Sequence, residues 1–242
     1  MVDVFDFSSI SSTNDYAKIL LDGRKSVIVS AKYQTKGRGR NNKRWVGDFG
    51  GNIFLSYGIR YDDGVQEVSQ EMMRFQAIGC LAVKSMLKKI APQLRIVLKY
   101  PNDVYAQHNK EWLKISGILV ENEFIGVTLK SSILGIGVNC YQSDFNDGIA
   151  ATSLQLLGMM EDIAIIKKNI IDELYSYLHM EYNTVITEWK NTLNIIGKTI
   201  IKADNSSSWV AHSFDDYGML IAVNGNEKTI ISNGDSIRYD LE

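Results

Sequence analysis

The chain has 242 residues and a formal net charge of -2, with 45% hydrophobic and 22% charged residues. This composition excludes a disordered chain, and the slightly acidic balance argues against a dedicated nucleic-acid-binding protein, which usually carries a broad basic face. The two cysteines have neither disulfide nor metal-ligand spacing, and no secretory signal or bilayer-spanning apolar run is visible, so we expect a cytoplasmic protein without membrane contact.

A strand, a helix and a basic loop are predicted for the first part of the chain. An alternating strand (2–7) leads to the N-cap candidates Ser12-Thr13-Asn14 of a helix that runs to Leu20. An apolar strand (27–31) then feeds the loop 34–45, which holds five cations and two glycines and ends at Trp45. Glycines let a backbone approach a ligand closely, and cations suit phosphate or carboxylate. The loop therefore predicts a site for a small anion.

The middle of the chain predicts an α+β domain. Its expected strands and helices are a strand at 52–60, a helix at 67–90, a strand at 96–98, a hairpin of 115–120 and 125–129 joined around Asn122-Glu123, a strand at 133–138 and a helix at 163–189. Because several strands follow one another without a helix between them, we expect a mixed or antiparallel sheet with flanking helices.

The pattern of apolar and turn-forming residues changes near residue 195. Short β-like runs there alternate with Asp, Asn, Ser and Gly turns, which predicts a small all-β barrel. We therefore expect two domains, residues 1–193 and 194–242.

Polar clusters follow several of the predicted elements. In Lys99-Tyr100-Pro101-Asn102-Asp103, the proline stops a strand and holds an amide and a carboxylate at a corner. That corner suits a magnesium nucleotide, but it is also typical of a simple strand cap. Lys114 suits an acyl-phosphate transition state or, equally, the protection of a sheet edge. Gly135-Ile136-Gly137 lacks the third glycine of a dinucleotide fingerprint and instead allows close approach to the strand.

Taken together and in this order, the clusters resemble those of the biotin–protein ligases (biotin–[acetyl-CoA-carboxylase] ligases). The matching segments are Ser12-Thr13-Asn14, Gln34 with Gly37-Arg38-Gly39-Arg40 and Trp45, Lys99-Tyr100-Pro101-Asn102-Asp103, Lys114-Ile115-Ser116-Gly117-Ile118-Leu119-Val120-Glu121, Gly135-Ile136-Gly137-Val138-Asn139, Gly218-Met219-Leu220, and Gly234-Asp235-Ser236-Ile237-Arg238. The resemblance spans nearly the whole chain. It implies a class II synthetase-like catalytic domain followed by an SH3-like β-barrel.

The resemblance also implies an activity. Such ligases join biotin and MgATP into biotinyl-5′-AMP and pyrophosphate, and then transfer biotin to a lysine of an apo biotin carboxyl carrier domain. The first step brings a carboxylate against a polyphosphate, so cations must neutralise the approach, and no protein nucleophile is needed. Because no helix-turn-helix fits before Val2, we expect the form without an N-terminal DNA-binding domain and no nucleic-acid partner. A homodimer is compatible with the predicted sheet edges.

Site residues carry over by position. The residues implied to bind biotin are Ser12, Thr13, Asn14, Gln34, Gly37, Arg38 and Gly117. Those implied to bind the nucleotide are Arg40, Trp45, Asn102, Asp103, Lys114 and Asn139. Lys114 and Arg38 are implied to be catalytic. No direct metal motif is present, and Mg²⁺ is expected to arrive with ATP near Asp103.

The chain departs from the family pattern at two places, and two alternative functions stay open. Tyr100 stands where a Trp is usual, and Asn42-Lys43 where Gly-Arg is common, so Lys43 lacks the arginine fork. One alternative is a lipoate or octanoyl ligase or transferase of the same fold. The other is a non-catalytic biotin-binding module. The glycine-arginine loop and the Lys99–Asp103 corner favour biotin, and Lys114 with Arg38 favours catalysis.

Overall fold

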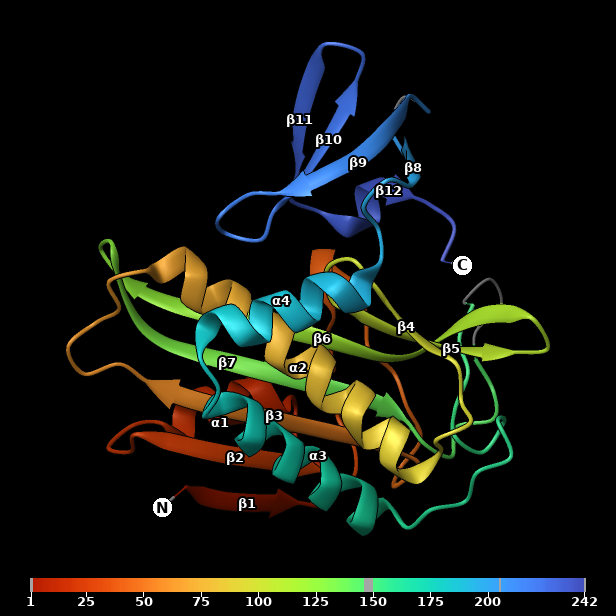
Figure 1. Ribbon diagram of the computed structural model, residues 1–242. Coiled ribbons are helices and arrows are strands. Elements are labelled where there is room, and N and C mark those ends of the chain that lie inside the picture. Colours follow the sequence, from red (N-terminus) through yellow and green to blue (C-terminus); the bar gives the residue numbers. More distant parts are fainter. Residues whose placement is uncertain (1, 146–149, 205, 242) are drawn as a thin grey trace.

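A seven-stranded mixed sheet forms the centre of the larger part of the molecule. The computed structural model describes residues 2–145, 150–204 and 206–241 (Figure 1). The strands of this sheet are β1 (Asp3–Phe7), β2 (Ser26–Ala31), β3 (Asn52–Arg60), β4 (Ile96–Lys99), β5 (Asp103–His108), β6 (Glu111–Ile125) and β7 (Thr128–Asn139), in the order β1-β2-β3-β7-β6-β5-β4. Only the β1–β2 pairing is parallel, which confirms the predicted mixed sheet.

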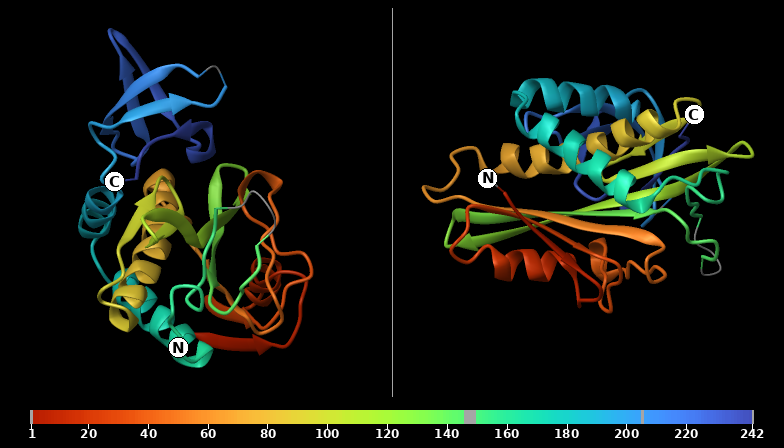
Figure 2. Two further views of the ribbon diagram at one scale, coloured as in Figure 1. Left: turned by 90° about the vertical axis from the view of Figure 1, so that its right-hand side faces the viewer. Right: turned by 90° about the horizontal axis from the view of Figure 1, so that it is seen from below.

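Helices cover the two faces of this sheet unequally. The helices α2 (Val68–Ile90), α3 (Ile163–Leu178) and α4 (Tyr182–Leu193) lie on one face, and α1 (Thr13–Leu20) lies on the other, as Figure 2 shows. Strand β2 faces both layers because its side chains alternate. Val27 and Val29 pack in a small core with α1, whereas Ile28 between them belongs to the main core. The face that carries α1 is therefore partly open, and the functional site lies there.

The C-terminal part is a second, five-stranded antiparallel sheet. Its strands are β8 (Thr199–Lys202), β9 (Ser208–Phe214), β10 (Leu220–Asn224), β11 (Glu227–Ile231) and β12 (Ile237–Arg238), in the order β11-β10-β9-β8-β12. The predicted all-β unit is confirmed. The expected barrel is open, however, since no pairing among the described strands joins β11 to β12. The division of the chain into domains at residues 193 and 194 stays a prediction.

Aromatic packing joins the two sheets. The fully buried Trp189 of α4 lies 6.1 Å from the ring of Tyr100 and 5.9 Å from that of Phe214. The Tyr100 hydroxyl donates to the carbonyl of Ile231 at 2.8 Å. Burial raises the pKa of Tyr100 to about 12, so this hydroxyl keeps the proton that it donates. The tyrosine that departs from the family pattern thus ties the polar corner to the C-terminal sheet.

The predicted hairpin between residues 115 and 129 is wrong in its turn and its length. Strand β6 continues through Asn122 and Glu123 to Ile125, and the chain turns at Gly126, which has a positive φ of 60°. Asn122 accepts a hydrogen bond at 2.7 Å from Ser132 of the neighbouring strand β7. The polar residues Asn122 and Glu123 therefore lie inside the strand, although in the sequence they are typical of a turn. Strand β5 was not predicted at all.

The predicted helix at 163–189 is two helices. Arg74 of α2 donates to the backbone carbonyls of Leu178 and Met180 at 2.8 and 3.0 Å, and thereby caps the C-terminal end of α3. Helix α4 then starts after Glu181. Among the described residues, no helix combines the length and the apolar character that a membrane crossing requires.

We predict that Tyr100→Phe lowers the free energy of unfolding by about 1–2 kcal/mol, because a buried carbonyl loses its hydrogen-bond donor. Urea denaturation measures the change. The control is Tyr217→Phe. Tyr217 is half-exposed, so this substitution should change stability by less than about 0.5 kcal/mol. Equal effects of the two substitutions would contradict the proposed link between the sheets.

Candidate active site

A pocket of about 720 Å³ opens on the face of the large sheet that carries α1. Its walls come from the start of α1, the basic loop, the Lys99–Asp103 corner, strands β6 and β7, and Asp235 of the C-terminal sheet. The predicted site residues that line it are Ser12, Thr13, Asn14, Gln34, Arg38, Arg40, Trp45, Asn102, Asp103, Lys114, Gly117 and Asn139. Gly37 is predicted but does not line it. A second hollow of about 770 Å³, next to Lys84 and Glu188, holds none of the predicted residues.

Three glycines form the floor of the pocket. Gly117 of β6 stands opposite Gly137 of β7, and Gly135 lies two residues away on the same face. A Cβ atom on Gly137 would come within 2.4 Å of the Trp45 ring, and one on Gly135 within 2.5 Å of the Asn14 amide oxygen. The close approach predicted for the Gly-Ile-Gly segment is therefore confirmed, and the groups that approach are Trp45 and Asn14.

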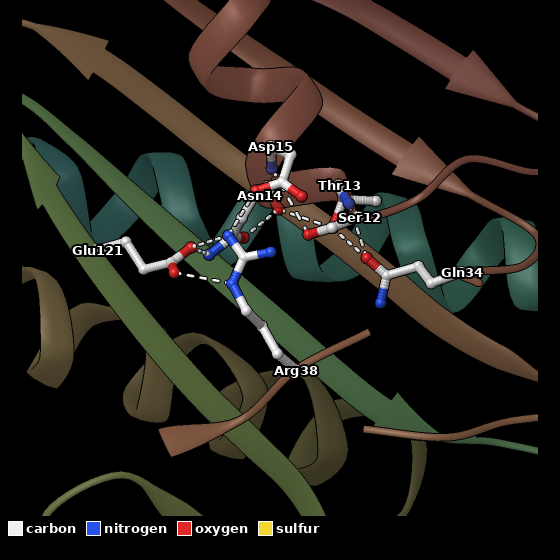
Figure 3. A network of polar contacts seen from close by, with 8 residues as sticks. Ser12, Thr13, Asn14, Asp15, Gln34, Arg38 and Glu121 are labelled. Carbon is white, nitrogen blue, oxygen red and sulfur yellow. Dashed lines mark hydrogen bonds and ion pairs between the residues drawn. The ribbon is translucent and has the colours of Figure 1, made fainter. Parts of the chain in front are cut away.

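A buried polar cluster stands at the start of α1 (Figure 3). Thr13 donates to the Gln34 side-chain oxygen from its backbone N–H at 2.6 Å and from its hydroxyl at 3.0 Å. Ser56 of β3 lies within hydrogen-bond distance of the Thr13 hydroxyl at 2.7 Å and the Asn14 amide oxygen at 2.6 Å. Ser12 is the N-cap and accepts from the backbone N–H of Asp15. The cluster thus fixes amide and hydroxyl groups in place before any ligand binds.

Arg38 is held by two carboxylates, Asp15 and Glu121, as Figure 3 shows. Its guanidinium donates to both oxygens of Glu121, at 2.9 and 2.8 Å, and to Asp15 at 2.6 Å. These bonds raise the pKa of Arg38 above its usual value, and the bond to Asp15 contributes most. Asn14 also donates to Glu121, at 2.6 Å. The loop is therefore tied at this end to the biotin-side cluster predicted from the sequence.

Lys114 reaches the pocket because strand β6 carries a bulge. The register with β5 shifts between Val104 and Tyr105, so Lys114 and Gly117 share the pocket face although they are three residues apart. The Lys114 ammonium lies 2.7 Å from the Asp103 carboxylate and 5.5 Å from the centre of the Trp45 ring. The Lys114 ammonium thus lies beside the glycine floor, and its ion pair with Asp103 orients the side chain.

The remaining predicted residues shape the walls. Arg40 donates to the Asn102 side-chain oxygen at 3.1 Å, and Asn102 donates to the Ile118 carbonyl at 2.8 Å. Asn139 donates to the carbonyl of Thr152 at 3.0 Å. Gly37 accepts from the backbone of Trp45, so its place is inside the loop rather than on the pocket surface.

Cations outnumber carboxylates on the pocket wall. The cationic side chains are Arg38, Arg40, Lys43, Arg44, Lys99 and Lys114, and the carboxylates are Asp103 and Asp235. Such an excess attracts a polyanion and stabilises negative charge that develops near it. Among the described residues, no group of three or more His, Cys, Asp or Glu side chains is arranged to hold a metal ion.

The family follows from a comparison with protein-family models. Residues 7–139 match the model described as the biotin/lipoate A/B protein ligase family. The chain belongs to this family.

Individual relatives agree with this assignment. The chain is 28% identical to the biotin–[acetyl-CoA-carboxylase] ligase of Mycobacterium tuberculosis, over 87% of this chain and 78% of the relative. It is 32% identical to the bifunctional ligase/repressor BirA of Bacillus spizizenii, over 88% of this chain and 66% of the relative. The biotin protein ligase of Aquifex aeolicus, solved with biotin and ATP, has the same fold with a TM-score of 0.70 and 21% identity, over 98% of this chain and 99% of that one.

Several residues in or beside the pocket have no predicted role. Glu121 closes the matching segment that starts at Lys114 but has no predicted role, although a carboxylate four residues after Gly117 in a chain with a basic loop is a usable signal. Asp15 and Asp235 received no role in the sequence analysis. Ala150 and Ala151 line the pocket beside Lys114 but carry no chemical signal. The Asn42 side chain lies outside the described part of the chain.

We predict that Gly137→Ala drives the Trp45 ring off the glycine floor, because the added methyl group would lie within 2.4 Å of it. Acrylamide quenching of tryptophan fluorescence should then increase. The same substitution in a Trp45→Phe background is the control and should leave quenching unchanged. An equal increase in both backgrounds would mean that the sheet, rather than the indole, has moved.

Proposed function

We propose that this chain is an ATP-dependent biotin–protein ligase. It converts biotin and ATP to biotinyl-5′-AMP and pyrophosphate, and then transfers the biotinyl group to a lysine of an apo biotin carboxyl carrier domain. The observation that carries the proposal is the position of Lys114, which stands between a buried polar cluster at one end of a bare glycine floor and a group of cations at the other. The family and the names of the relatives support it.

The proposed biotin end is the start of α1. Ser12, Thr13 and Gln34 offer hydroxyl and amide groups to the ureido ring, and the two bonds between Thr13 and Gln34 lower the cost of ordering that pair. The floor at Gly117, where the Trp45 ring lies in the structure, accepts the flat, apolar part of the ligand when that ring moves aside. Asn14 and Gly37 contribute indirectly, Asn14 by orienting Glu121 and Gly37 by shaping the loop.

The proposed nucleotide end is formed by the basic loop and the Lys99–Asp103 corner. Arg40, Asn102 and Asn139 lie there, and Trp45 closes over the ligand near the adenine. Arg38 exchanges its carboxylate partners for a phosphate when the loop covers the intermediate. A covered site keeps water from the mixed anhydride, which water would hydrolyse.

The chemistry proposed for Lys114 is electrostatic. A carboxylate oxygen of biotin attacks the α-phosphorus of ATP, and the bond to pyrophosphate breaks. Both partners are anions, so a fixed ammonium group between them lowers the barrier. Asp103, at 2.7 Å, orients the Lys114 side chain. In the second step, the neutral amine of the carrier lysine attacks the acyl carbon and AMP leaves, again without a protein nucleophile.

Mg²⁺ is proposed to enter with the phosphates of ATP. Magnesium ions commonly take one or two protein carboxylates together with phosphate oxygens and water. Asp103 supplies one such carboxylate at the polar corner. This agrees with that coordination pattern, which needs no full set of protein ligands among the described residues. When bound, the metal would neutralise phosphate charge.

Further parts of the proposal concern partners and location. We propose a cytoplasmic enzyme whose protein substrate is a carrier domain, with no nucleic-acid or membrane partner, and a homodimer is its candidate assembly. The alternatives are a lipoate or octanoyl ligase or transferase, and a binding module without turnover. The family description covers both biotin and lipoate, but the names of the relatives and the fold shared with a ligase solved with biotin and ATP favour biotin over either alternative.

We predict that Lys114→Ala lowers biotin-dependent pyrophosphate release by about 100- to 1,000-fold, the usual loss when one transition-state charge contact is removed. A coupled pyrophosphate assay measures the rate, and circular dichroism checks that the variant folds. Lys114→Arg keeps the charge and should retain part of the activity.

The matched control is Lys110→Ala, in the exposed turn between β5 and β6, which should leave the rate unchanged. Pyrophosphate release at the wild-type rate from Lys114→Ala would refute the role assigned to Lys114.

A further inference from the structure

A short turn of the C-terminal sheet sits directly on the polar corner of the pocket. The turn consists of Asn233 and the 3-10 segment η2 (Gly234–Ser236). A Cβ atom on Gly234 would lie 2.0 Å from the Tyr100 carbonyl oxygen and 2.5 Å from Pro101 Cδ. Only a residue without a side chain therefore allows this seating. The neighbouring residue, Asp235, is thereby brought to the rim of the pocket.

Asp235 bonds to the basic loop through both carboxylate oxygens. One oxygen accepts from the Lys43 ammonium at 3.0 Å and the other from the Asn41 amide at 2.9 Å. Asn41 has a positive φ of 53°, a conformation that asparagine tolerates better than most residues and that aims its side chain at the turn. The loop and the turn are thus complementary in charge and in hydrogen bonding.

A second contact lies beside the first. Arg40 donates to the Asn233 side-chain oxygen at 3.4 Å and to the Ser232 carbonyl at 3.5 Å. Burial alone would raise the pKa of the Asp235 carboxyl, but its bonds to Lys43 and Asn41 outweigh burial and hold the pKa below its usual value. The carboxylate is therefore charged at neutral pH and holds the loop by ionic as well as neutral hydrogen bonds.

We infer that Asp235 is a positioning residue that latches the basic loop over the pocket, so that closure of the loop depends on the C-terminal sheet. Asp235 lies at the outer end of the loop, and the Asp15–Glu121 pair holds Arg38 at the inner end. The latch gives Lys43 a role that its departure from the family pattern left open. That the latched loop covers an adenylate rests on the proposed function; that the latch exists does not.

Limited trypsin digestion of the protein without ligands tests the latch. Asp235→Ala should speed cleavage after Arg40 and Arg44 by roughly three- to tenfold, the range expected when an exposed ion pair and a hydrogen bond are lost together. Cleavage of a briefly opened segment follows the population of the open form, so the rate reports the latch directly. Fragment masses identify the cleaved bonds.

Two further variants make the test specific. Glu227→Ala removes an exposed carboxylate of the same sheet, at the start of β11, and should leave the cleavage rate unchanged. Lys43→Asp combined with Asp235→Lys should restore slow cleavage after Arg40 and Arg44, because the pair is rebuilt with its charges exchanged. Unchanged cleavage in Asp235→Ala, or no recovery in the exchanged pair, would overturn the latch.

Kinetics test whether the latch serves the nucleotide. Asp235→Ala should raise the KM for ATP several-fold while kcat changes less. Without the latch, part of the binding energy of ATP must be used to close the loop. If cleavage accelerates but the KM for ATP is unchanged, Asp235 does not position the nucleotide site. If the wild type releases no pyrophosphate while cleavage still responds to Asp235→Ala, the proposed function fails and the latch stands.

Discussion

Two glycines face each other across strands β6 and β7, and the pocket exists because neither carries a side chain. Gly117 and Gly137 leave the backbone of a large sheet bare on one face, while Ile118 and Ile136 beside them pack into the main core on the other. A flat group can therefore lie directly on the sheet, and Trp45 does so in the structure. The polar cluster at one end and the cations at the other have their effect only because this floor brings both within reach of one small ligand.

At each end of the basic loop, one cation is paired with carboxylate side chains. Arg38 is held by Asp15 and Glu121 at the inner end, and Lys43 is held by Asp235 at the outer end. This arrangement offsets part of the positive charge of the loop in a chain whose formal net charge is -2. Arg38 and Lys43 have carboxylate partners, whereas Arg40 bonds to neutral groups. A phosphate must therefore compete with Asp15 and Glu121 for Arg38. The loop is therefore suited to one small anion and is held in place until that anion arrives.

Much of the site was predictable because its residues follow secondary structure in local motifs. Pro101 marks a corner and the Gly135–Gly137 pair marks a bare strand, and each signal lies within a few residues of the chain. The bulge at β6 that aims Lys114 into the pocket was not predictable, since register depends on pairing with β5, a strand that the sequence analysis missed. The contact of Asp235 with the loop joins segments almost 200 residues apart, and no local pattern announces such a contact. The open C-terminal sheet likewise depends on pairings that composition does not specify.

The pocket is proposed to activate biotin with ATP. The most direct test measures pyrophosphate release by the unmodified protein with ATP and Mg²⁺, in the presence of biotin, of lipoate, or of both. We expect release that requires biotin, and we expect that an excess of lipoate neither replaces biotin nor inhibits the release. Release that occurs with lipoate and not with biotin, or no release with either acid, would contradict it.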